Sequence, residues 1–284
     1  MIAIAKALWF IENRFDRDTS LAEIASACGL SRFHLTRAFG IATGYSVMRY
    51  VRGRRLTEAA RILVDGAPDI LTVALQAGYG SHEAFTRAFH EQFGVTPEVL
   101  RSRADLKNIK LVEPIRMNKT LIVDLEEPRI EDGEALLIAG FGGRYSFATN
   151  HNIPLLWQRF SPHIGVVPGQ VDATTYGVCC NPDGEGNFEY IAGVGVSGFG
   201  GLNTDYRCLR IPAQHYAVFS HRGHISTIRS TVYTIWNKWL PESRYEQADG
   251  PDFERYDERF DANLGTGLLE IWVPIREQTN QILN

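Results

Sequence analysis

The first part of the chain carries apolar side chains at the spacing of short helices, separated by polar positions. Between residues 20 and 40, two groups of apolar residues each fall on one helical face. They are Leu21, Ile24 and Ala25 in the first segment, and Leu35, Ala38 and Phe39 in the second. This pattern predicts two amphipathic helices in close succession, each with one buried face.

Cap residues mark the ends of these two helices. Ser20 is followed three residues later by Glu23, which is the spacing of a capping box. Gly29 stands where a helix ends in a left-handed residue, and Ser31 is a suitable cap for the next helix. Residues 20–40 are therefore predicted to form a helix, a tight turn and a second helix.

The same arrangement recurs later in the chain. The segment "SRFHLTRAFGIATGYS" (31–46) is matched by "SHEAFTRAFHEQFGVT" (81–96), with Ser, Thr-Arg-Ala-Phe and Gly in register. A short apolar helix and a turn at Gly78 again precede the second copy, and Phe85, Ala88 and Phe89 repeat the buried positions. The pattern predicts two copies of one helix-turn-helix unit.

The polar faces of the repeated helices carry candidate base-reading side chains. These are Arg32, Phe33, Thr36 and Arg37 in the first copy, and His82, Glu83, Thr86 and Arg87 in the second. Arg binds guanine through two hydrogen bonds, Thr contacts a thymine methyl group or donates a hydrogen bond, and Glu accepts from the cytosine amino group. One such helix alone is more often a solvated surface helix, but two capped copies with glycine turns favour DNA recognition.

Residues 120–284 change to the pattern of strands, with short β-like runs separated by Gly and Pro. The clearest runs are "LLIAGFGGRY", "TYGVCC", "FEYIAGVGV", "HYAVFSHRG" and "LLEIWVPI". Two helical patterns, "IPLLWQRFSPH" and "ISTIRSTVYTIWNKWL", interrupt them. The order of these elements repeats faintly, which predicts two packed α/β halves with a cleft at their junction.

Charge divides the chain at the same place. Residues 1–110 hold 15 Lys and Arg against 11 Asp and Glu, whereas residues 111–284 hold 14 against 22. The stretch between the halves is charged, weakly periodic and broken by Pro114. The predicted boundaries are 1–106 for a helical DNA-binding domain, 107–119 for a linker and 120–284 for a second domain that contains the strands.

Several other kinds of site are not indicated. The four Cys include the adjacent pair Cys179 and Cys180, which is no disulfide framework and favours a reducing cytosol. No apolar run reaches the length of a membrane span. The Gly-rich "GVGVSGFGG" lacks the setting of a nucleotide fingerprint, and His221 with His224 lacks further metal ligands. We therefore expect a cytoplasmic protein with no catalytic residues, no cofactor and no metal.

The segment from about Asp18 to Arg103 resembles the DNA-binding domains of the AraC/XylS family. The resemblance is carried by "SLAEIASACGLSRFHLTRAFGIATGYS", "YVRGRRLTEAARIL" and "TVALQAGYGSHEAFTRAFHEQFGVTPEVLR". It implies seven helices, with two helix-turn-helix units joined by a long helix at about 47–65, so that one chain reads two major-groove segments about one helical turn apart. Many members have Trp at the position of Phe33 and Gln near His82 and Glu83, which implies a different operator.

Four arginines of the joining helix have two open interpretations. Arg49, Arg52, Arg54 and Arg55 either contact DNA phosphates or form ion pairs within this region. Phosphate contacts would position the protein without specifying a sequence.

Residues 120–284 resemble the GyrI-like small-molecule-binding domain of multidrug-responsive regulators. The best-matching parts are "YAVFSHRGHISTIRSTVYTIWNKWLPES", "DGPDFERYDERF" and "LEIWVPI". In this family a Glu on the last strand commonly lies in an aromatic-lined cleft, and Glu270 is the matching residue. Candidate walls of this cleft are Tyr145, Trp157, Tyr190, Phe219, Trp236 and Trp272.

The two resemblances together are those of a Rob-type member of the AraC family. They imply a multidomain fold, in which an all-α double helix-turn-helix domain is followed by an α+β GyrI-like (duplicated SHS2-type) domain. Glu270 lies in an otherwise apolar strand, where an ionised carboxylate needs a partner. We expect a bound organic cation to be that partner, with aromatic rings adding cation–π contacts, and we expect burial to raise the pKa of Glu270 in the free protein.

The predicted function is that of a sequence-specific DNA-binding transcriptional regulator. Its expected partners are double-stranded DNA, a small amphipathic or cationic effector and RNA polymerase, and no membrane. Two alternatives stay open for the second domain. One is a hydrolase in which Glu270 activates water, and the other is a domain that binds no ligand and only contacts another protein.

Overall fold

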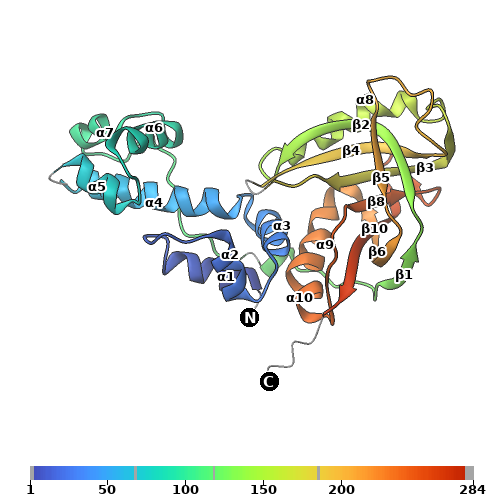
Figure 1. Ribbon diagram of the computed structural model, residues 1–284, viewed down its shortest axis with the longest axis horizontal. Helices are drawn as coiled ribbons and strands as arrows, with labels where there is room; N and C mark the ends of the chain where they lie inside the picture. The colour runs from blue at the N-terminus through green and yellow to red at the C-terminus, as the bar shows by residue number, and fades with distance from the viewer. Residues whose placement is uncertain (1–2, 67–68, 118, 184–185, 279–284) are drawn as a thin grey trace. The chain divides into compact units, whose positions relative to one another are not determined.

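The computed structural model describes residues 3–66, 69–117, 119–183 and 186–278. They form two compact units, one built mainly from residues 3–39 and 45–117 and the other from residues 119–278 (Figure 1). The first unit is helical and the second is built on an antiparallel sheet, which confirms the predicted fold class. Within the described ranges, no helix has both the length and the apolar composition needed to cross a bilayer.

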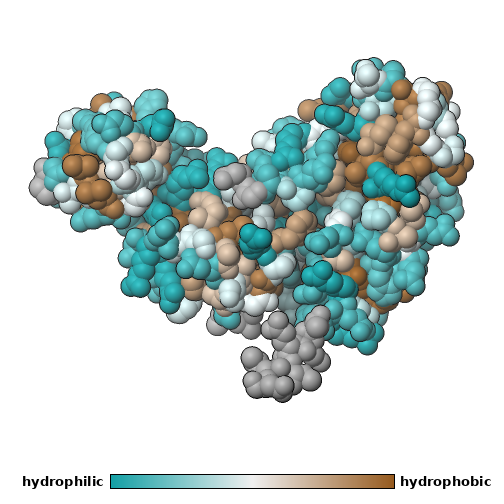
Figure 2. All heavy atoms as spheres, viewed as in Figure 1, coloured by the Kyte–Doolittle hydropathy of each residue, from teal (hydrophilic) through white to brown (hydrophobic). Residues whose placement is uncertain are grey.

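The described part of the first unit contains the seven helices that the family resemblance implies. They are α1 (Ala3–Glu12), α2 (Leu21–Cys28), α3 (Arg32–Thr43), α4 (Val47–Val64), α5 (Ile70–Gln76), α6 (His82–Phe93) and α7 (Pro97–Arg103). The pairs α2–α3 and α5–α6 are the two helix-turn-helix units, and α4 joins them. Figure 2 shows a largely hydrophilic face on this unit, with a hydrophobic patch over α5, where Leu71 and Leu75 are exposed.

The helix ends follow from the predicted cap residues. The Glu23 N–H donates to Ser20 Oγ at 3.2 Å and the Glu23 carboxylate accepts from the Ser20 N–H at 2.7 Å, which confirms the capping box. Gly29 ends α2 with a φ of 71°, in the left-handed region that favours glycine. Ser31 Oγ then accepts from the His34 N–H at 3.1 Å. Local hydrogen bonds therefore fix the turn between α2 and α3.

The apolar faces of the two repeated helices are buried as predicted, except that Ala88 of α6 is half-buried. Leu35, Ala38 and Phe39 of α3 are fully buried, and so are Phe85 and Phe89 of α6. The rings of Phe85 and Phe89 are 5.4 Å apart and belong to an apolar cluster that includes residues of α4, α5 and α7. Each helix is thus held by its apolar face, so its opposite face projects from the unit.

The residues that follow α7 have no regular secondary structure, yet they pack along α4. Val112 is buried, its N–H donates to Thr57 Oγ1 at 2.9 Å, and its C=O accepts from Arg54 Nη1 at 3.0 Å. Ile109 and Leu111 pack against the apolar cluster around α6. Much of the stretch predicted as a linker therefore packs against the helices of the first unit.

The second unit consists of a ten-stranded sheet with helices in its connections. Its strands are β1 (Arg129–Gly133), β2 (Leu136–Ser146), β3 (Gln170–Cys180), β4 (Asn187–Val196), β5 (Arg207–Ile211), β6 (Gln214–His224), β7 (Tyr245–Gln247), β8 (Asp252–Tyr256), β9 (Phe260–Asp261) and β10 (Thr266–Glu277). Its helices are α8 (Ile153–Phe160), α9 (Ile228–Thr234), the π-helix η5 (Ile235–Trp239), α10 (Leu240–Glu242) and the 3₁₀ turns η1 (Lys119–Leu121), η2 (Asn150–Asn152), η3 (Ser161–His163) and η4 (Ile225–Thr227).

Two halves share this sheet by exchanging their first strands. The order is β1-β6-β10-β8-β3-β4-β2-β5, with β7 and β9 paired to β10. The strands β2, β3 and β4 with α8 form one half, and β6, β8 and β10 with α9 form the other. However, β1 pairs with β6 and β5 pairs with β2, so each half contributes one strand to the other. The halves meet where β3 pairs with β8.

The contacts of residues 104–117 lead to a prediction about truncation. We expect a fragment of residues 1–116 to fold alone as a monomer, because both helix-turn-helix units and their apolar cores lie within it. A fragment of residues 1–103 should melt about 10 °C lower. Burial of one side chain such as Val112 contributes about 1.5–3 kcal/mol, and 1 kcal/mol shifts the midpoint of a small domain by about 4–8 °C.

Thermal unfolding followed by circular dichroism measures this difference. A fragment of residues 1–110, which keeps Ile109 but lacks Val112, serves as the control and should melt between the other two. Equal midpoints for the fragments 1–103 and 1–116 would show that the segment after α7 adds no stability.

Candidate functional site

The first candidate DNA-contacting surface is the polar face of α3. Arg32 is exposed, and Phe33, Thr36 and Arg37 are half-buried. Thr36 Oγ1 donates to the Arg32 carbonyl at 2.9 Å, one helical turn earlier. The cap at Ser31 and the buried apolar face fix the rotation of α3, so these four positions share the face away from the core.

The polar face of α6 carries the second set. Glu83 and Arg87 are exposed, whereas His82 and Thr86 are half-buried. His82 Nε2 lies 3.0 Å from Glu98 Oε1 on α7, so this ring already has a protein partner. The Thr86 hydroxyl is buried and has no hydrogen-bond partner among the described residues. Backbone and side-chain hydrogen bonds at the start of α6 hold the pKa of Glu83 below its ordinary value.

The arginines of α4 divide between the two interpretations left open by the sequence. Arg54 is 3% exposed and contacts Glu12 of α1 and Glu58 of α4, so it is an internal ion pair. Arg55 donates to backbone carbonyls in the segment between α1 and α2. Arg49 and Arg52 are exposed, and only these two have the exposure that phosphate contacts need.

Glu270 on β10 is 2% exposed and is surrounded by guanidinium groups. Its Oε1 accepts from Arg129 Nη2 at 3.0 Å and from Arg259 Nη2 at 2.8 Å. Its Oε2 accepts from Arg255 Nη1 at 3.1 Å and from Trp272 Nε1 at 3.1 Å. Four hydrogen bonds therefore occupy the four lone-pair positions of this carboxylate.

The expected direction of the Glu270 pKa shift is therefore wrong. Burial by itself raises the pKa, as the sequence analysis assumed, but the hydrogen bonds from Arg259, Trp272 and the other two arginines outweigh burial and lower it below its ordinary value. We expected a bound cation to be the partner of Glu270, but the arginines of the protein itself are its partners. Asp257 also pairs with Arg255 and Arg259, so carboxylates balance much of the positive charge.

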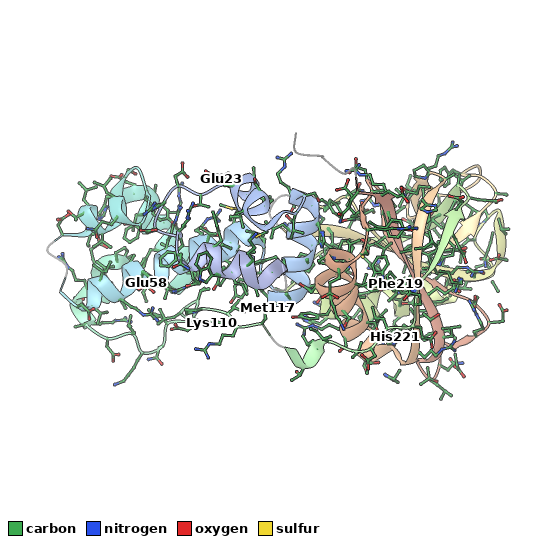
Figure 3. All side chains as sticks on the ribbon, turned by 90° about the horizontal axis from the view of Figure 1, so that it is seen from below. Glu23, Glu58, Lys110, Met117, Phe219 and His221 are labelled. Atoms are coloured by element: carbon green, nitrogen blue, oxygen red, sulfur yellow. The ribbon has the colours of Figure 1, made fainter. Side chains whose placement is uncertain are left out.

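The structure separates the aromatic residues that the sequence analysis grouped. Phe219 and Trp236 are each 1% exposed and lie in the core. Figure 3 labels Phe219 on β6, within the second unit. Trp272 stacks on Phe253 and donates to Glu270, on the arginine-rich face of the sheet. Hence these three rings do not line a common ligand site.

The other three predicted rings lie together around Glu254, a carboxylate that the sequence analysis did not select. Tyr190 donates from its hydroxyl to Glu254 Oε2 at 2.7 Å, and Trp157 Nε1 donates to the Tyr190 oxygen at 3.0 Å. Tyr145 lies edge-to-face with Tyr190 at 6.5 Å. These contacts link α8, β2, β4 and β8.

Two further rings complete this arrangement. Tyr256 donates to Glu254 Oε2 at 2.9 Å, and its ring lies 5.4 Å from that of Trp157 and 5.0 Å from that of Phe260. Burial raises the pKa of Tyr256 well above the ordinary value, so the phenol stays protonated and donates. We call Trp157, Tyr190, Glu254, Tyr256 and Phe260 the Glu254 cage.

Gly177 on β3 makes room for the Glu254 cage. A Cβ atom at this position would lie 2.0 Å from the Tyr190 hydroxyl and 2.5 Å from Glu254 Oε2. Any side chain there would displace both groups. The signal in the sequence was the alternation of "DFERYD", in which Glu254 and Tyr256 share one face of a strand and Arg255 takes the other.

Two cavities of the second unit lie elsewhere. One of about 330 Å³ is lined by Arg129, Arg255, Tyr216 and Trp272, with Glu131 and other carboxylates at its rim, and Glu270 is not in its wall. The other, of about 560 Å³, lies between the residues preceding β1 and the segment from η5 to β7. Among the described residues, no group of three or more His, Cys, Asp or Glu could hold a metal.

The guanidinium groups around Glu270 make its contribution to stability pH-dependent. Because the folded pKa is lowered, the stabilisation is fully present above the glutamate pKa of the unfolded chain, about 4.3, and is lost as pH falls through the folded value. We expect Glu270→Gln to lower the free energy of unfolding at neutral pH by about 2 kcal/mol, since it leaves three partly exposed guanidinium groups without their shared partner.

Urea unfolding followed by tryptophan fluorescence, repeated at a series of pH values, measures this effect. The gap between parent and Glu270→Gln should narrow below about pH 4.3. Glu131→Gln, which removes an exposed partner of Arg129, is the control and should change stability little. Parallel pH curves for the parent and Glu270→Gln would contradict the assignment.

Comparisons with known proteins agree with this division of the chain. Residues 126–276 match the family described as GyrI-like small molecule binding domain, and residues 20–103 match the family described as helix-turn-helix domain. The chain is 26% identical to the transcriptional regulator Rob of Salmonella typhimurium, over 96% of this chain and 98% of that protein. It is 25% identical to the right origin-binding protein of Escherichia coli over the same shares of both chains.

A further relative matches the first unit alone. The multiple antibiotic resistance protein MarA of Salmonella typhimurium is 35% identical over 35% of this chain and 79% of its own length. The GyrI-like match covers more than half of the chain. The chain therefore belongs to the GyrI-like small-molecule-binding family, and it is a DNA-binding transcriptional regulator with an AraC-type helix-turn-helix domain ahead of its effector-binding domain.

Proposed function

We propose that α3 and α6 each enter the major groove of one operator and that a single chain reads two successive groove segments. The base-reading side chains are Arg32, Phe33, Thr36 and Arg37 on α3, and His82, Glu83, Thr86 and Arg87 on α6. The observation that carries this proposal is the duplication: each set projects from a capped helix whose opposite face is buried. Arg49 and Arg52 are proposed phosphate contacts.

RNA polymerase is a further proposed partner, because regulation of transcription acts on polymerase at the promoter. The exposed side chains of Leu71 and Leu75, one turn apart on α5, are available to a protein partner of this kind. Their exposure of 49% and 57% is high for leucine in a packed helix.

For the effector we propose an amphipathic organic cation bound at Glu254 in place of Glu270. The supporting observation is that Trp157, Tyr190 and Tyr256 surround the Glu254 carboxylate, whereas Glu270 is already bound by three arginines. Hydrogen bonds from neutral phenols orient a carboxylate without neutralising its charge. Aromatic faces next to a carboxylate attract organic cations through both charge and cation–π contact.

Binding at the Glu254 cage involves rearrangement of the rings. The Trp157 indole and both phenols hydrogen-bond to one another or to Glu254, so a bulky ligand must displace at least one of them to reach the carboxylate. We propose that Trp157 moves, because it comes from α8 and donates only one hydrogen bond in this group. This links effector binding to the position of α8.

We do not assign hydrolase activity to Glu270. A general base must accept a proton from water, and the four hydrogen bonds to Glu270 leave it no lone pair for that purpose. The lowered pKa further reduces its basicity. The proposed role of the second unit is therefore binding rather than catalysis.

The assignment of the recognition helices predicts the effect of arginine substitutions. On a duplex recovered by in vitro selection with the full chain, Arg37→Ala and Arg87→Ala should each lose about 1–3 kcal/mol of specific binding and relax the preference at one base pair. Arg37→Lys and Arg87→Lys keep the charge but cannot form the bidentate contact, so they should lose base preference while keeping the salt dependence.

Competition binding with single-base variants of the duplex separates these effects. Arg103→Ala, at the last residue of α7 and outside both recognition helices, is the control and should keep the base preference unchanged. Full affinity and full selectivity in all four substituted proteins would remove Arg37 and Arg87 from the set of base contacts.

The Glu254 cage should bind a cation more tightly than a neutral ligand of the same shape. Benzyltrimethylammonium and neopentylbenzene have nearly the same shape but differ in charge. Glu254→Gln should weaken binding of the cation about 10–100-fold, as expected for loss of a charged hydrogen-bonding partner worth about 1.5–3 kcal/mol, and should leave the neutral analogue little changed.

Chemical-shift titration of the full chain measures both affinities. Glu270→Gln provides the matched control, since it removes another hydrogen-bonded glutamate of the same sheet and should not alter cation affinity. If Glu270→Gln weakened the cation and Glu254→Gln did not, the effector site would belong to Glu270 after all.

A further inference from the structure

One face of α4 is covered by the residues that follow α7. Figure 3 labels Glu58 on α4 and, on this following segment, Lys110 and Met117. The covered face of α4 consists of Tyr50, Gly53, Arg54, Thr57 and Arg61. Their spacing of three and four residues places them in one stripe along the helix. We call residues 106–115 the brace.

The centre of the brace is in close contact with the helix backbone. A Cβ atom on Gly53 would lie only 2.8 Å from Val112 Cγ2, nearer than real Cβ atoms approach a neighbour. Val112 is 4% exposed, and Thr57 and Arg54 hydrogen-bond to its N–H and C=O. Arg61 adds a two-pronged contact to Glu113 at 2.8 Å. The absence of a side chain at Gly53 therefore sets how closely the brace approaches.

The two ends of the brace contact different helix-turn-helix units. At one end, Leu106, Ile109 and Leu111 pack against the apolar cluster that includes Phe85 and Phe89 of α6.

At the other end, the Ile115 N–H donates to the Tyr50 hydroxyl at 3.1 Å. The Tyr50 ring lies 5.6 Å from that of Phe39 on α3, and its hydroxyl donates to Glu12 of α1 at 2.5 Å. The brace thus runs along the joining helix from the core of the second helix-turn-helix unit to that of the first.

We propose that the brace is a positioning element for DNA recognition, which holds α4 rigid and so fixes the separation and phase of α3 and α6. Gly53, Thr57 and Val112 are the positioning residues. The inference rests on the proposed reading of one operator by both helices. An 18-residue helix can bend toward an unsupported face, and the brace supports this face of α4 from Tyr50 to Arg61.

If the rotational position of α3 relative to α6 is fixed, the affinity for DNA must depend on the spacing between the two half-sites. Inserting one base pair between them rotates one half-site relative to the other by about one-tenth of a turn. The parent protein should therefore bind the selected duplex at least about tenfold more tightly than the duplex with the insertion, since only one helix can then dock in register. A parent protein without this discrimination would refute two-helix reading itself, independently of the brace.

Gly53→Ala tests the brace directly. Alanine favours the helix more than glycine does, so α4 itself should gain stability, but the added methyl group must push Val112 away. We expect the discrimination between the two duplexes to fall at least threefold. The double variant Gly53→Ala with Val112→Ala removes the clash and should restore discrimination toward the parent value.

Thr57→Val is the second variant, since it keeps the shape of the side chain and removes the acceptor for the Val112 N–H. It should reduce the spacing discrimination in the same direction, which keeps the test decisive if Gly53→Ala does not fold. Unchanged discrimination in both single variants would overturn the proposal. An equal loss of affinity for both duplexes, without a change in their ratio, would also overturn it, because that result indicates destabilisation and not positioning.

Discussion

Strand β8 joins the two halves of the sheet, and the alternation of its side chains sends charge of opposite sign to its two faces. Arg255 lies opposite Glu270 on β10 and Tyr176 on β3, whereas Glu254 lies opposite Gly177 on the other face. A carboxylate that is buried, as Glu270 is, or half-buried, as Glu254 is, is costly unless it is paired or hydrogen-bonded. The protein satisfies this constraint with guanidinium groups on one face and with phenols on the other.

This difference determines what each carboxylate can do. Glu270 is bound on both oxygens by cations and an indole, so it stabilises the join between β1, β8, β10 and the segment around Arg259. Glu254 is held by tyrosines inside a ring cluster, which is the environment that an organic cation can share. Two adjacent residues of β8 therefore serve the two sites: Arg255 binds the structural Glu270 of β10, and Glu254 belongs to the proposed binding site on the other face.

The parts of the fold that sequence predicts well are those governed by neighbours along the chain. The capping box at Ser20 and Glu23, the left-handed Gly29 and the buried Phe85 and Phe89 all follow from local spacing, and the structure confirms them. The family resemblance added the number of helices and the order of the domains. In the second unit, the same kind of analysis identified the strands. It also named six candidate rings around Glu270, three of which gather near Glu254 instead.

The partners of Glu270 could not be found this way, because they converge from distant parts of the sequence. Arg129 is 141 positions away and belongs to a strand that crosses into the other half, so no local pattern connects the two. The apolar neighbours of Glu270 in the sequence suggested that a bound cation is its partner. In the folded protein, three arginines from other segments take this role. Glu254 was overlooked for the opposite reason. Other acidic residues surround it in the sequence between 252 and 261, which is typical of a solvated face, although its alternation with Phe253 and Arg255 placed it on a defined face of β8.

The brace shows why an aperiodic segment can still be well determined. Its contacts depend on a glycine in the middle of a helix, where glycine lowers helix stability by about 1 kcal/mol relative to alanine and would be expected only for a packing reason. Gly53 provides that reason by admitting Val112 against the helix backbone.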